Sequence, residues 1–229
     1  MVRIITIIIP TYNERENIEE LIKRIFKVVK KEKLNLEVIV VDDGSNDGTP
    51  EIVMLLSKKY KIKLLERVKK LGLISAALDG LKLAKGNTIG VMDSDLAHPP
   101  EKIPEFLKEL KNNDIVIASR YIKDAGIKKW SLYRIVISWG ATLIARLFLN
   151  VKVKDPMSGF FFLKREIIEK TKFESDGFKI LLNILVKNKN KKVKEVPYTF
   201  IERKKGKSKL GFREIINYLI TVLRLKMDN

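Results

Sequence analysis

Short runs of apolar, mostly β-branched residues alternate with longer amphipathic stretches through the first half of the chain. The apolar runs cover residues 4–9, 37–41, 62–65, 88–92 and 115–118. Helix-type stretches fill the intervals, beginning near an N-cap-like Asn13, at Pro50, at Leu73 and after Pro100. Strands covered on both faces have this composition, and regular alternation of strands and helices is typical of a parallel sheet. The sequence therefore predicts an α/β fold with an open, mostly parallel sheet and helices on both sides.

The second half of the chain contains one unusually apolar stretch, residues 130–150. Its polar residues recur every four positions, which places them on one stripe of a helix. They are Arg134, Ser138, Thr142 and Arg146. Two interpretations stay open: the helix packs into the core or against a partner subunit, or it lies in lipid headgroups with the aromatic residues Trp130, Tyr133 and Trp139 at the boundary. A further strand is predicted over residues 193–200 and a closing amphipathic helix over residues 212–225.

The chain is strongly basic, with 46 Lys and Arg residues against 28 acidic residues and a formal net charge of +18. Such a balance predicts a polyanionic partner, which is nucleic acid, an anionic membrane surface or a phosphorylated substrate. Many basic residues gather between Lys187 and Lys209. They accompany neither an aromatic-rich RNA-binding motif nor a helix-turn-helix pattern. A basic nucleic-acid-binding α/β protein therefore stays as an alternative of another class.

The sequence contains no cysteine, which excludes disulfides and thiolate chemistry and is compatible with a reducing cytosol. Residues 1–10 are apolar but too short for a membrane span, and they lack a cleavage site, so we expect a strand there. We expect a protein that is soluble or only peripherally attached to a membrane.

Polar loops follow three of the predicted strands, at residues 11–14, 42–45 and 93–95. The carboxyl ends of parallel strands meet at one edge of a sheet, and ligands of open α/β sheets bind there. We expect the three loops to converge on one crevice, although a tight turn also explains residues 42–44. The usual Gly-rich dinucleotide and P-loop motifs are missing, so a nucleotide site would depend on acidic loops and a metal.

Asp93 and Asp95 follow the fourth apolar run and precede Pro99 and Pro100. Residues i and i+2 of an extended chain point to the same side, so the two carboxylates would repel each other. Strong hydrogen bonds or a shared cation would be needed to offset this repulsion. Oxygen ligands alone suit Mg²⁺ or Mn²⁺. The alternative is that these aspartates only cap the following helix. His98 is the only histidine, and we expect it to belong to the turn that enters that helix rather than to act as a general base.

Taken together, these motifs resemble the family-2 glycosyltransferases of the GT-A fold. P-x-Y-N-E follows the first strand, VDDGSxDGT the second and D-x-D the fourth, in the family's order and spacing. Residues 118–121, 155–160, 177–180 and 203–209, with Arg134 and Ser138, are similar to the branch that contains dolichol-phosphate mannose synthases and polyprenyl-phosphate glycosyltransferases. The resemblance covers nearly the whole chain and implies a single GT-A domain over residues 1–229. Its nucleotide-sugar half would span about residues 1–125, and its acceptor- and membrane-facing half about residues 126–229.

The resemblance also implies roles for individual residues. The base and ribose of a nucleotide sugar would be held by Pro10, Tyr12, Glu14, Val41 and Asp43. Ribose, diphosphate and a metal ion, Mg²⁺ or Mn²⁺, would be held by Asp93, Ser94 and Asp95, with Asp93 and Asp95 as the metal carboxylates. The donor phosphates would be contacted by Arg120, Arg203 and Lys209, and the acceptor phosphate by Arg134 and Ser138. The expected catalytic residues are Asp95, Asp93 and Arg134.

One position departs from the family pattern. The family usually reads D-x-D-L-Q-H-P-P, in which the Gln supplies a further metal oxygen, whereas this chain has Ala97. A methyl group cannot coordinate, so water would have to fill that position. We expect weaker but surviving metal dependence; the alternative is that the donor or the reaction differs from the family's.

The activity implied by the resemblance is the inverting, metal-dependent transfer of mannose from GDP-mannose to dolichyl or another polyprenyl phosphate. A related enzyme that uses a UDP-sugar, such as a glucosyltransferase, is the alternative, because these motifs do not fix the base or the sugar. We expect a cytoplasmic protein bound peripherally to the cytoplasmic face of the membrane, with no nucleic-acid partner. Some relatives continue into transmembrane helices, whereas this chain ends at Asn229 and is expected to lack them. The 206–209 loop could fold over the donor site as a lid.

Overall fold

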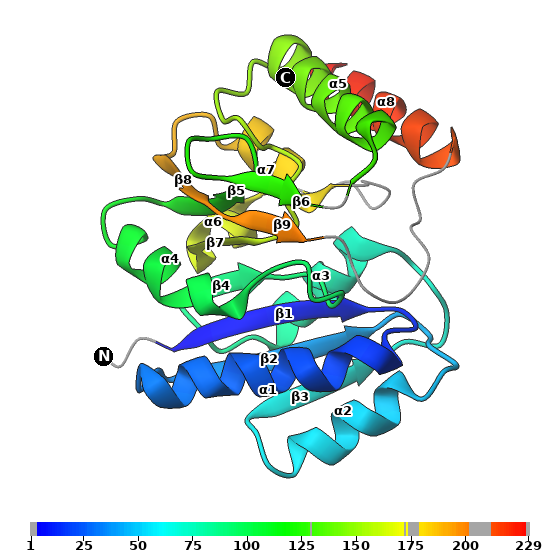
Figure 1. The fold of residues 1–229 in the computed structure, drawn as a ribbon, viewed down its shortest axis with the longest axis vertical. Helices are drawn as coiled ribbons and strands as arrows, with labels where there is room; N and C mark the ends of the chain where they lie inside the picture. Colours follow the sequence, from blue (N-terminus) through cyan, green and yellow to red (C-terminus); the bar gives the residue numbers. More distant parts are fainter. Residues whose placement is uncertain (1–3, 129, 172, 174–178, 202–211, 228–229) are drawn as a thin grey trace.

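The computed structural model describes residues 4–128, 130–171, 173, 179–201 and 212–227, and the side chains of residues 212–215 are not described. Its main element is a seven-stranded sheet with the strand order β3-β2-β1-β4-β7-β5-β8 (Figure 1). Neighbouring strands are parallel except β7, which is antiparallel to both β4 and β5. The strands are β1 (Ile5–Thr11), β2 (Leu36–Asp42), β3 (Ile62–Glu66), β4 (Thr88–Val91), β5 (Ile115–Ser119), β7 (Phe161–Lys164) and β8 (Val193–Pro197). The predicted α/β fold with a mostly parallel sheet is confirmed.

Helices cover both faces of the sheet, because successive side chains of each buried strand point to opposite faces. On β1, Ile9 belongs to the apolar cluster that includes residues of α1, α2 and α4, while Ile8 belongs to the cluster on the other face, which includes residues of α3, α6 and α7. The helices are α1 (Arg15–Lys31), α2 (Thr49–Ser57), α3 (Leu73–Leu83), η1 (Pro100–Lys102), α4 (Ile103–Glu109), α5 (Leu132–Leu149), α6 (Arg165–Lys170), α7 (Ile180–Lys187) and α8 (Phe212–Met227). Because helices cover both faces of the sheet, side chains on both sides of the central strands are buried, and these strands are continuous apolar runs in the sequence.

The N-cap predicted at Asn13 is wrong. Helix α1 begins at Arg15, and its N-cap residue Glu14 makes no capping hydrogen bond through its side chain. Asn13 has a positive φ of 56°, and its side-chain oxygen accepts the N–H of Asn46 at 3.1 Å. The residue therefore ties two loops together instead of starting the helix.

Strand β7 has a role that the alternating pattern does not predict. It runs antiparallel between β4 and β5, which places the aromatic residues of its segment in the middle of the sheet. A Cβ added at Gly90 on β4 would lie 2.5 Å from the Phe162 ring, so only glycine lets that ring lie against the neighbouring strand. The close fit between β4 and β7 brings the residues before β7 next to the loop after β4.

The strand predicted over residues 193–200 is two strands. Strand β8 ends at Pro197 in the main sheet, and β9 (Thr199–Ile201) pairs with β6 (Gly126–Lys128) in a separate two-stranded sheet. Tyr198 lies between them and is buried. The change of direction carries the chain from the main sheet towards the start of α5.

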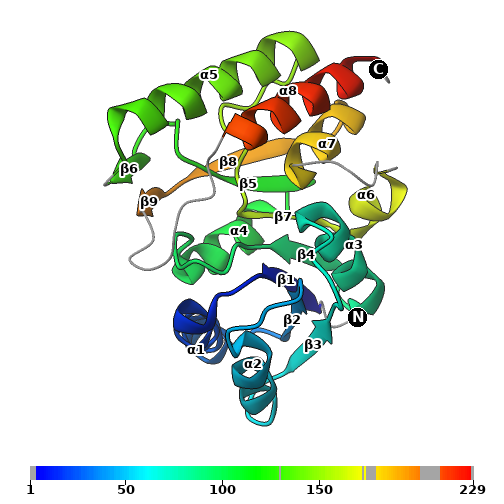
Figure 2. The same ribbon diagram turned by 90° about the vertical axis from the view of Figure 1, so that its right-hand side faces the viewer.

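Helices α5 and α8 lie side by side at one end of the molecule, away from α1 and α2 (Figures 1 and 2). The Tyr218 hydroxyl on α8 donates to the carbonyl oxygen of Ala141 on α5. By length and composition, helix α5 is apolar enough to cross a membrane. Only 17% of its residues are buried within the protein, so most of this apolar helix is on the surface. Its buried or half-buried side includes Arg134, Ser138 and Thr142, while its exposed side carries large apolar residues. The C-terminal half of α5 also packs Ala145 and Leu149 into the core, so the helix is apolar on its exposed side as well as on part of its buried side.

Candidate active site

The three predicted loops converge at the carboxyl ends of β1, β2 and β4. The Asp43 N–H donates to the Thr11 carbonyl at 2.9 Å, and the Asn13 N–H donates to Ser45 Oγ at 2.8 Å. The Ser94 hydroxyl, from the loop after β4, donates to the Pro10 carbonyl at 3.2 Å. These bonds confirm the predicted convergence, and Pro10 takes part in it through its main chain.

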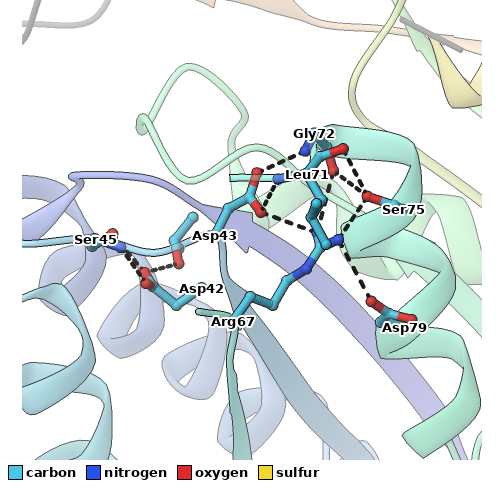
Figure 3. Close-up of polar contacts among 9 residues, drawn as sticks. Asp42, Asp43, Ser45, Arg67, Leu71, Gly72, Ser75 and Asp79 are labelled. Atoms are coloured by element: carbon cyan, nitrogen blue, oxygen red, sulfur yellow. Dashed lines mark hydrogen bonds and ion pairs between the residues drawn. The ribbon is translucent and has the colours of Figure 1, made fainter. Parts of the chain in front are cut away.

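Asp42 and Asp43 have different hydrogen-bond partners, as Figure 3 shows. Asp42 is buried and accepts hydrogen bonds from the Thr11 hydroxyl and from both the N–H and the hydroxyl of Ser45. A carboxylate with three such donors is satisfied within the fold. Asp42 therefore fixes the loop after β2 against the end of β1.

Asp43 reaches the other way, to the loop between β3 and α3 (Figure 3). Its two oxygens accept the N–H groups of Leu71 and Gly72, each at 2.9 Å, and Arg67 Nη1 lies 3.1 Å from Oδ1. Arg67 also donates to Ser75 Oγ at 2.7 Å. Asp43 thus holds the 67–72 loop beside the site. Sequence reasoning missed Arg67, because no local pattern links it to a carboxylate on another strand.

The remaining residues of the expected base and ribose site occupy different environments. Tyr12 is half-buried, and the Lys70 ammonium lies 4.1 Å from its ring centroid. Glu14 is buried and accepts a hydrogen bond from Asn17 Nδ2 at 2.8 Å. Val41 has a fully buried side chain in the core, so its side chain is directed away from any ligand. Tyr12 and the Lys70 loop therefore form the accessible part of this side.

The loop after β4 is bent. Strand β4 ends at Val91, bends follow at residues 94–96, and Leu96 has a positive φ of 63°. The argument that residues two apart on an extended chain share a face therefore does not apply to Asp93 and Asp95. Instead, Asp95 Oδ1 accepts the Ala97 N–H at 3.1 Å, which closes a tight local turn.

His98 holds this loop in place. Its Nδ1 accepts the Asp93 N–H at 3.3 Å, and its ring stacks on Phe160 at a centroid distance of 5.3 Å. Burial lowers the pKa of His98 despite the nearby carboxylates of Asp93 and Asp95. A buried, neutral imidazole whose Nδ1 is already an acceptor supports the interpretation of His98 as part of the turn.

The carboxylates of Asp93 and Asp95 fit a divalent ion whose remaining ligands come from a substrate. The Asp93 side chain is 40% exposed, and a Cβ added at Gly159 would lie 2.3 Å from its Oδ2, so glycine makes room for this carboxylate. No group of three potential metal-ligating His, Cys, Asp or Glu residues occurs in the part of the chain that the structure describes. Mg²⁺ commonly binds one or two carboxylates together with substrate phosphates and water. Ala97 is buried in the same loop, and its methyl group has no atom that could bind a metal ion.

Arg120 is held by a buried carboxylate. Its side-chain Nε and Nη2 each lie 2.8 Å from an oxygen of Asp155. The main-chain N–H of Arg120 donates to the same carboxylate at 3.0 Å. Burial alone would lower the pKa of Arg120, but Asp155 raises it. Glu195 in turn accepts the N–H groups of Lys154 and Asp155. Arg120 is thus a fixed, paired cation. The sequence places Asp155 in a family motif but does not show that it pairs with Arg120, because 35 residues separate the two.

Lys179 is a further basic residue close to this group. Burial lowers the pKa of its ammonium group, while the carboxylates of Asp93 and Asp155 oppose that shift. The positive charge of nearby Arg120 also lowers the pKa of Lys179. The sequence places Lys179 within a family motif but gives it no role.

The expected acceptor residues lie on the inner side of α5. The Tyr121 hydroxyl donates to Ser138 Oγ at 2.7 Å, and Arg134 Cζ lies 5.3 Å from the centroid of the Trp130 ring. Both α5 residues are half-buried. Arg120 Cζ lies 5.6 Å from the same Trp130 ring, so this group adjoins the Arg120–Asp155 pair.

Comparison with known proteins identifies the family. The sequence model described as Glycosyl transferase family 2 matches residues 6–172. The chain belongs to this family. Dolichol-phosphate mannosyltransferase of Pyrococcus furiosus is 47% identical over 96% of the chain, which spans 63% of that relative's length. The enzyme of the same name from Saccharomyces cerevisiae is 39% identical over 93% of the chain and 84% of its own length.

Solved structures place this family-2 glycosyltransferase in the GT-A fold. A Pyrobaculum calidifontis mannosyltransferase in complex with GDP-Man and Mn²⁺ gives a TM-score of 0.70 at 20% identity, covering 98% of this chain and 64% of that chain. Glucosyl-3-phosphoglycerate synthase from Mycobacterium tuberculosis gives a TM-score of 0.72 at 19% identity, covering 99% and 79%. At these identities the likeness concerns the fold.

Two residues expected in the donor site of this glycosyltransferase, Arg203 and Lys209, lie outside the described residues, as does the 206–209 loop. The described residues of the expected donor site lie at the carboxyl ends of β1, β2 and β4, except Arg120, which follows β5. Arg134 and Ser138 form a separate group on α5.

Proposed function

We propose that this family-2 glycosyltransferase transfers mannose from GDP-mannose to dolichyl or another polyprenyl phosphate, with inversion at the anomeric carbon. The observation that carries the proposal is the similarity to proteins named dolichol-phosphate mannosyltransferase, at 35–47% identity over 93–96% of the chain. The arrangement of polar groups at the sheet edge and on α5 suits both substrates.

On the donor side, Asp93 and Asp95 would hold Mg²⁺ or Mn²⁺, with water in the position that the family fills with Gln. The bound ion would neutralise the diphosphate of the departing GDP. Tyr12 and the loop held by Asp43 lie where a base and ribose would be placed, at the ends of β1 and β2. The hydrogen bonds that fix these loops before substrate arrives lower the cost of orienting the donor.

On the acceptor side, the phosphate is already an anion near neutral pH, so attack needs orientation more than a strong base. A phosphate oxygen forms a bond to the anomeric carbon while the bond from that carbon to the GDP β-phosphate oxygen breaks. Arg134 and Ser138 would aim the phosphate. Because Ser138 Oγ accepts a hydrogen bond from the Tyr121 hydroxyl, the Ser138 hydroxyl can itself donate a hydrogen bond to the phosphate.

Membrane contact would come from the outer faces of α5 and α8, which we call the apolar platform. Its members are more than 40% exposed: Leu132, Tyr133, Val136, Trp139, Leu147, Phe148, Ile216, Leu219, Ile220, Leu223 and Met227. Exposed apolar residues gathered on adjacent helices mark an interaction surface. A lipid acceptor gives this surface a purpose, because the polar side of α5 then faces the site while its apolar side faces lipid. We propose peripheral attachment at the cytoplasmic face, with residues 126–229 as the acceptor half of a single domain.

A donor panel tests the proposed activity. The purified protein is incubated with polyprenyl phosphate, Mn²⁺ and radiolabelled GDP-mannose, UDP-glucose or UDP-N-acetylglucosamine, and label is counted in the lipid extract. We expect label from GDP-mannose alone, its loss on chelation, and none when free polyprenol replaces the phosphate. Transfer from UDP-glucose instead would support the UDP-sugar alternative, and no lipid label from any donor would contradict a lipid-phosphate glycosyltransferase.

A further inference from the structure

Trp130 precedes α5 and has a polar atom that the fold leaves unused. Among the residues the structure describes, its indole Nε1 is buried and has no hydrogen-bond partner. Buried N–H groups are nearly always bonded, and an exception in a native fold points to a missing water, ion or ligand. The indole can only donate, so the missing partner must be an acceptor.

The surroundings of the ring favour an anionic acceptor. The ring centroid lies 5.6 Å from Arg120 Cζ and 5.3 Å from Arg134 Cζ, and Phe200 packs on it at 5.0 Å. Asp155 already pairs with Arg120, whereas Arg134 brings a second guanidinium group to the same ring. An anion beside the indole N–H would be attracted by this positive charge and would accept the unused hydrogen bond.

The start of α5 adds to this preference. Ser131 is its N-cap residue but makes no capping hydrogen bond through its side chain. The first N–H groups of a helix lack partners within it and carry the positive end of its dipole. The N–H of Arg134 already donates to the Ser131 carbonyl at 3.1 Å, so the unpaired donors are those of the first residues after Ser131, close to Trp130 in the chain.

We propose that the indole N–H of Trp130 donates a hydrogen bond to the phosphate monoester of the lipid acceptor. This inference rests on the proposed function, since Arg134 of the expected acceptor site adjoins the same ring. Trp130 thereby becomes a binding and positioning residue, in contrast to the membrane-boundary role that the sequence indicates for it. The exposed Trp139 on the apolar platform keeps that boundary role.

The test observes the indole directly. Protein labelled with ¹⁵N in its Trp indoles gives two cross-peaks, because the chain contains two Trp residues, and Trp130→Phe assigns them. Farnesyl phosphate serves as the probe, with farnesol, inorganic phosphate, and GDP with Mg²⁺ as separate titrations. We expect farnesyl phosphate to move the Trp130 indole proton downfield in a saturable way, and farnesol to leave it in place. Inorganic phosphate should act in the same direction but only at higher concentration.

Kinetics supply the second readout. Trp130→Phe keeps an aromatic ring beside the arginines and removes the N–H, so the KM for polyprenyl phosphate should rise about tenfold or more. The KM for GDP-mannose should stay unchanged. Tyr60→Phe, which removes the polar atom of an aromatic residue stacked on Phe26 outside both expected substrate sites, should change neither value. The inference would be overturned if the chemical shift of the Trp130 indole proton did not change with farnesyl phosphate, changed equally with farnesol, or changed only with GDP.

The two proposals fail separately in this design. An indole response to farnesyl phosphate without mannose transfer would contradict the proposed function and leave the phosphate site standing. Mannose transfer with a silent indole would leave the function standing and remove the role of Trp130.

Discussion

Gly159 determines where the Asp93 carboxylate lies. Because a Cβ at this position would lie 2.3 Å from Asp93 Oδ2, Gly159→Ala must push the carboxylate aside. A misplacement of about 1 Å can cost roughly a hundredfold in rate, so we expect a drop of tenfold to a hundredfold in kcat for mannose transfer. The displaced group is the end of a flexible side chain, so the free energy of unfolding should change by less than about 1 kcal/mol.

Gly126 provides the matched control, because a Cβ there meets nothing within 4 Å. Gly126→Ala should leave both activity and the urea unfolding midpoint unchanged. Equal activity in the Gly159→Ala variant and the wild type would show that the position of Asp93 is irrelevant to transfer.

Ala97 sets the strength of metal binding in this account. Ala97→Gln restores an amide oxygen at the family's ligand position, so the metal concentration that gives half-maximal transfer should fall several-fold. A titration of activity with Mg²⁺ or Mn²⁺ measures it. The side chain at this position is buried, so a urea unfolding curve must accompany the titration. A correctly folded variant with an unchanged titration would remove water substitution as the explanation.

Local sequence motifs identify Asp93 and Asp95 as candidate ligands, and the motif order points to the family. They do not reveal Arg67, and they do not show that Asp155 pairs with Arg120. Each of these residues acts on a partner from another element, Asp43 and Arg120 respectively. Such pairs depend on how the chain folds back on itself, which motif spacing does not contain.

Helix α5 has an exposed apolar side on which substitutions can test membrane contact. Val136 and Leu147 are 65% and 71% exposed on the apolar platform. Replacing both with Gln removes apolar area that would enter the lipid boundary, so binding to anionic phospholipid vesicles should weaken roughly tenfold. Vesicle sedimentation measures this, and GDP-mannose binding should not change.

Helix α2 offers the control for the same experiment, because Met54 and Leu55 are 51% and 64% exposed at the far end of the molecule. The double Gln variant of these residues should sediment like the wild type. Equal losses from both helices, or from neither, would mean that the apolar platform is not the membrane contact.

The strands and helices of the first half could be predicted because each one repeats a local pattern. Strand β7 could not. Its run of apolar residues fits a strand, but no local pattern specifies its antiparallel direction or its place between β4 and β5, where Gly90 makes room for the Phe162 ring. The break after Pro197 was missed for a similar reason, since β9 leaves the main sheet to pair with a strand from a distant part of the chain.

At the scale of the whole molecule, Glu37 joins strands β1, β2 and β3 and the segment before β4. Its carboxylate accepts the Thr6 hydroxyl at 2.8 Å and the Lys85 N–H at 2.7 Å, and Lys63 Nζ lies 3.3 Å away. Burial alone would raise the pKa of Glu37, but these partners hold it below its ordinary value of 4.5. The carboxylate therefore stabilises the fold above the ordinary pKa, and this contribution is lost as the pH falls through the lowered one.

Glu37→Gln should reduce the free energy of unfolding at pH 7 by about 1–3 kcal/mol, because it removes a charged acceptor from buried donors. Urea unfolding from pH 7 down to about pH 3 should show the difference from the wild type shrinking below pH 4.5. A difference that stays constant over that range would mean that the charge of Glu37 does not contribute.

The most direct test of the central claim is the initial rate of mannose transfer from GDP-mannose to polyprenyl phosphate in the Asp95→Asn variant. Asp124→Asn is the matched control, since Asp124 is exposed and its positive φ of 65° suits Asn. We predict that Asp95→Asn lowers the rate roughly a hundredfold or more at saturating metal, whereas Asp124→Asn retains the wild-type rate. A folded Asp95→Asn variant that transfers mannose as fast as the wild type would contradict the account.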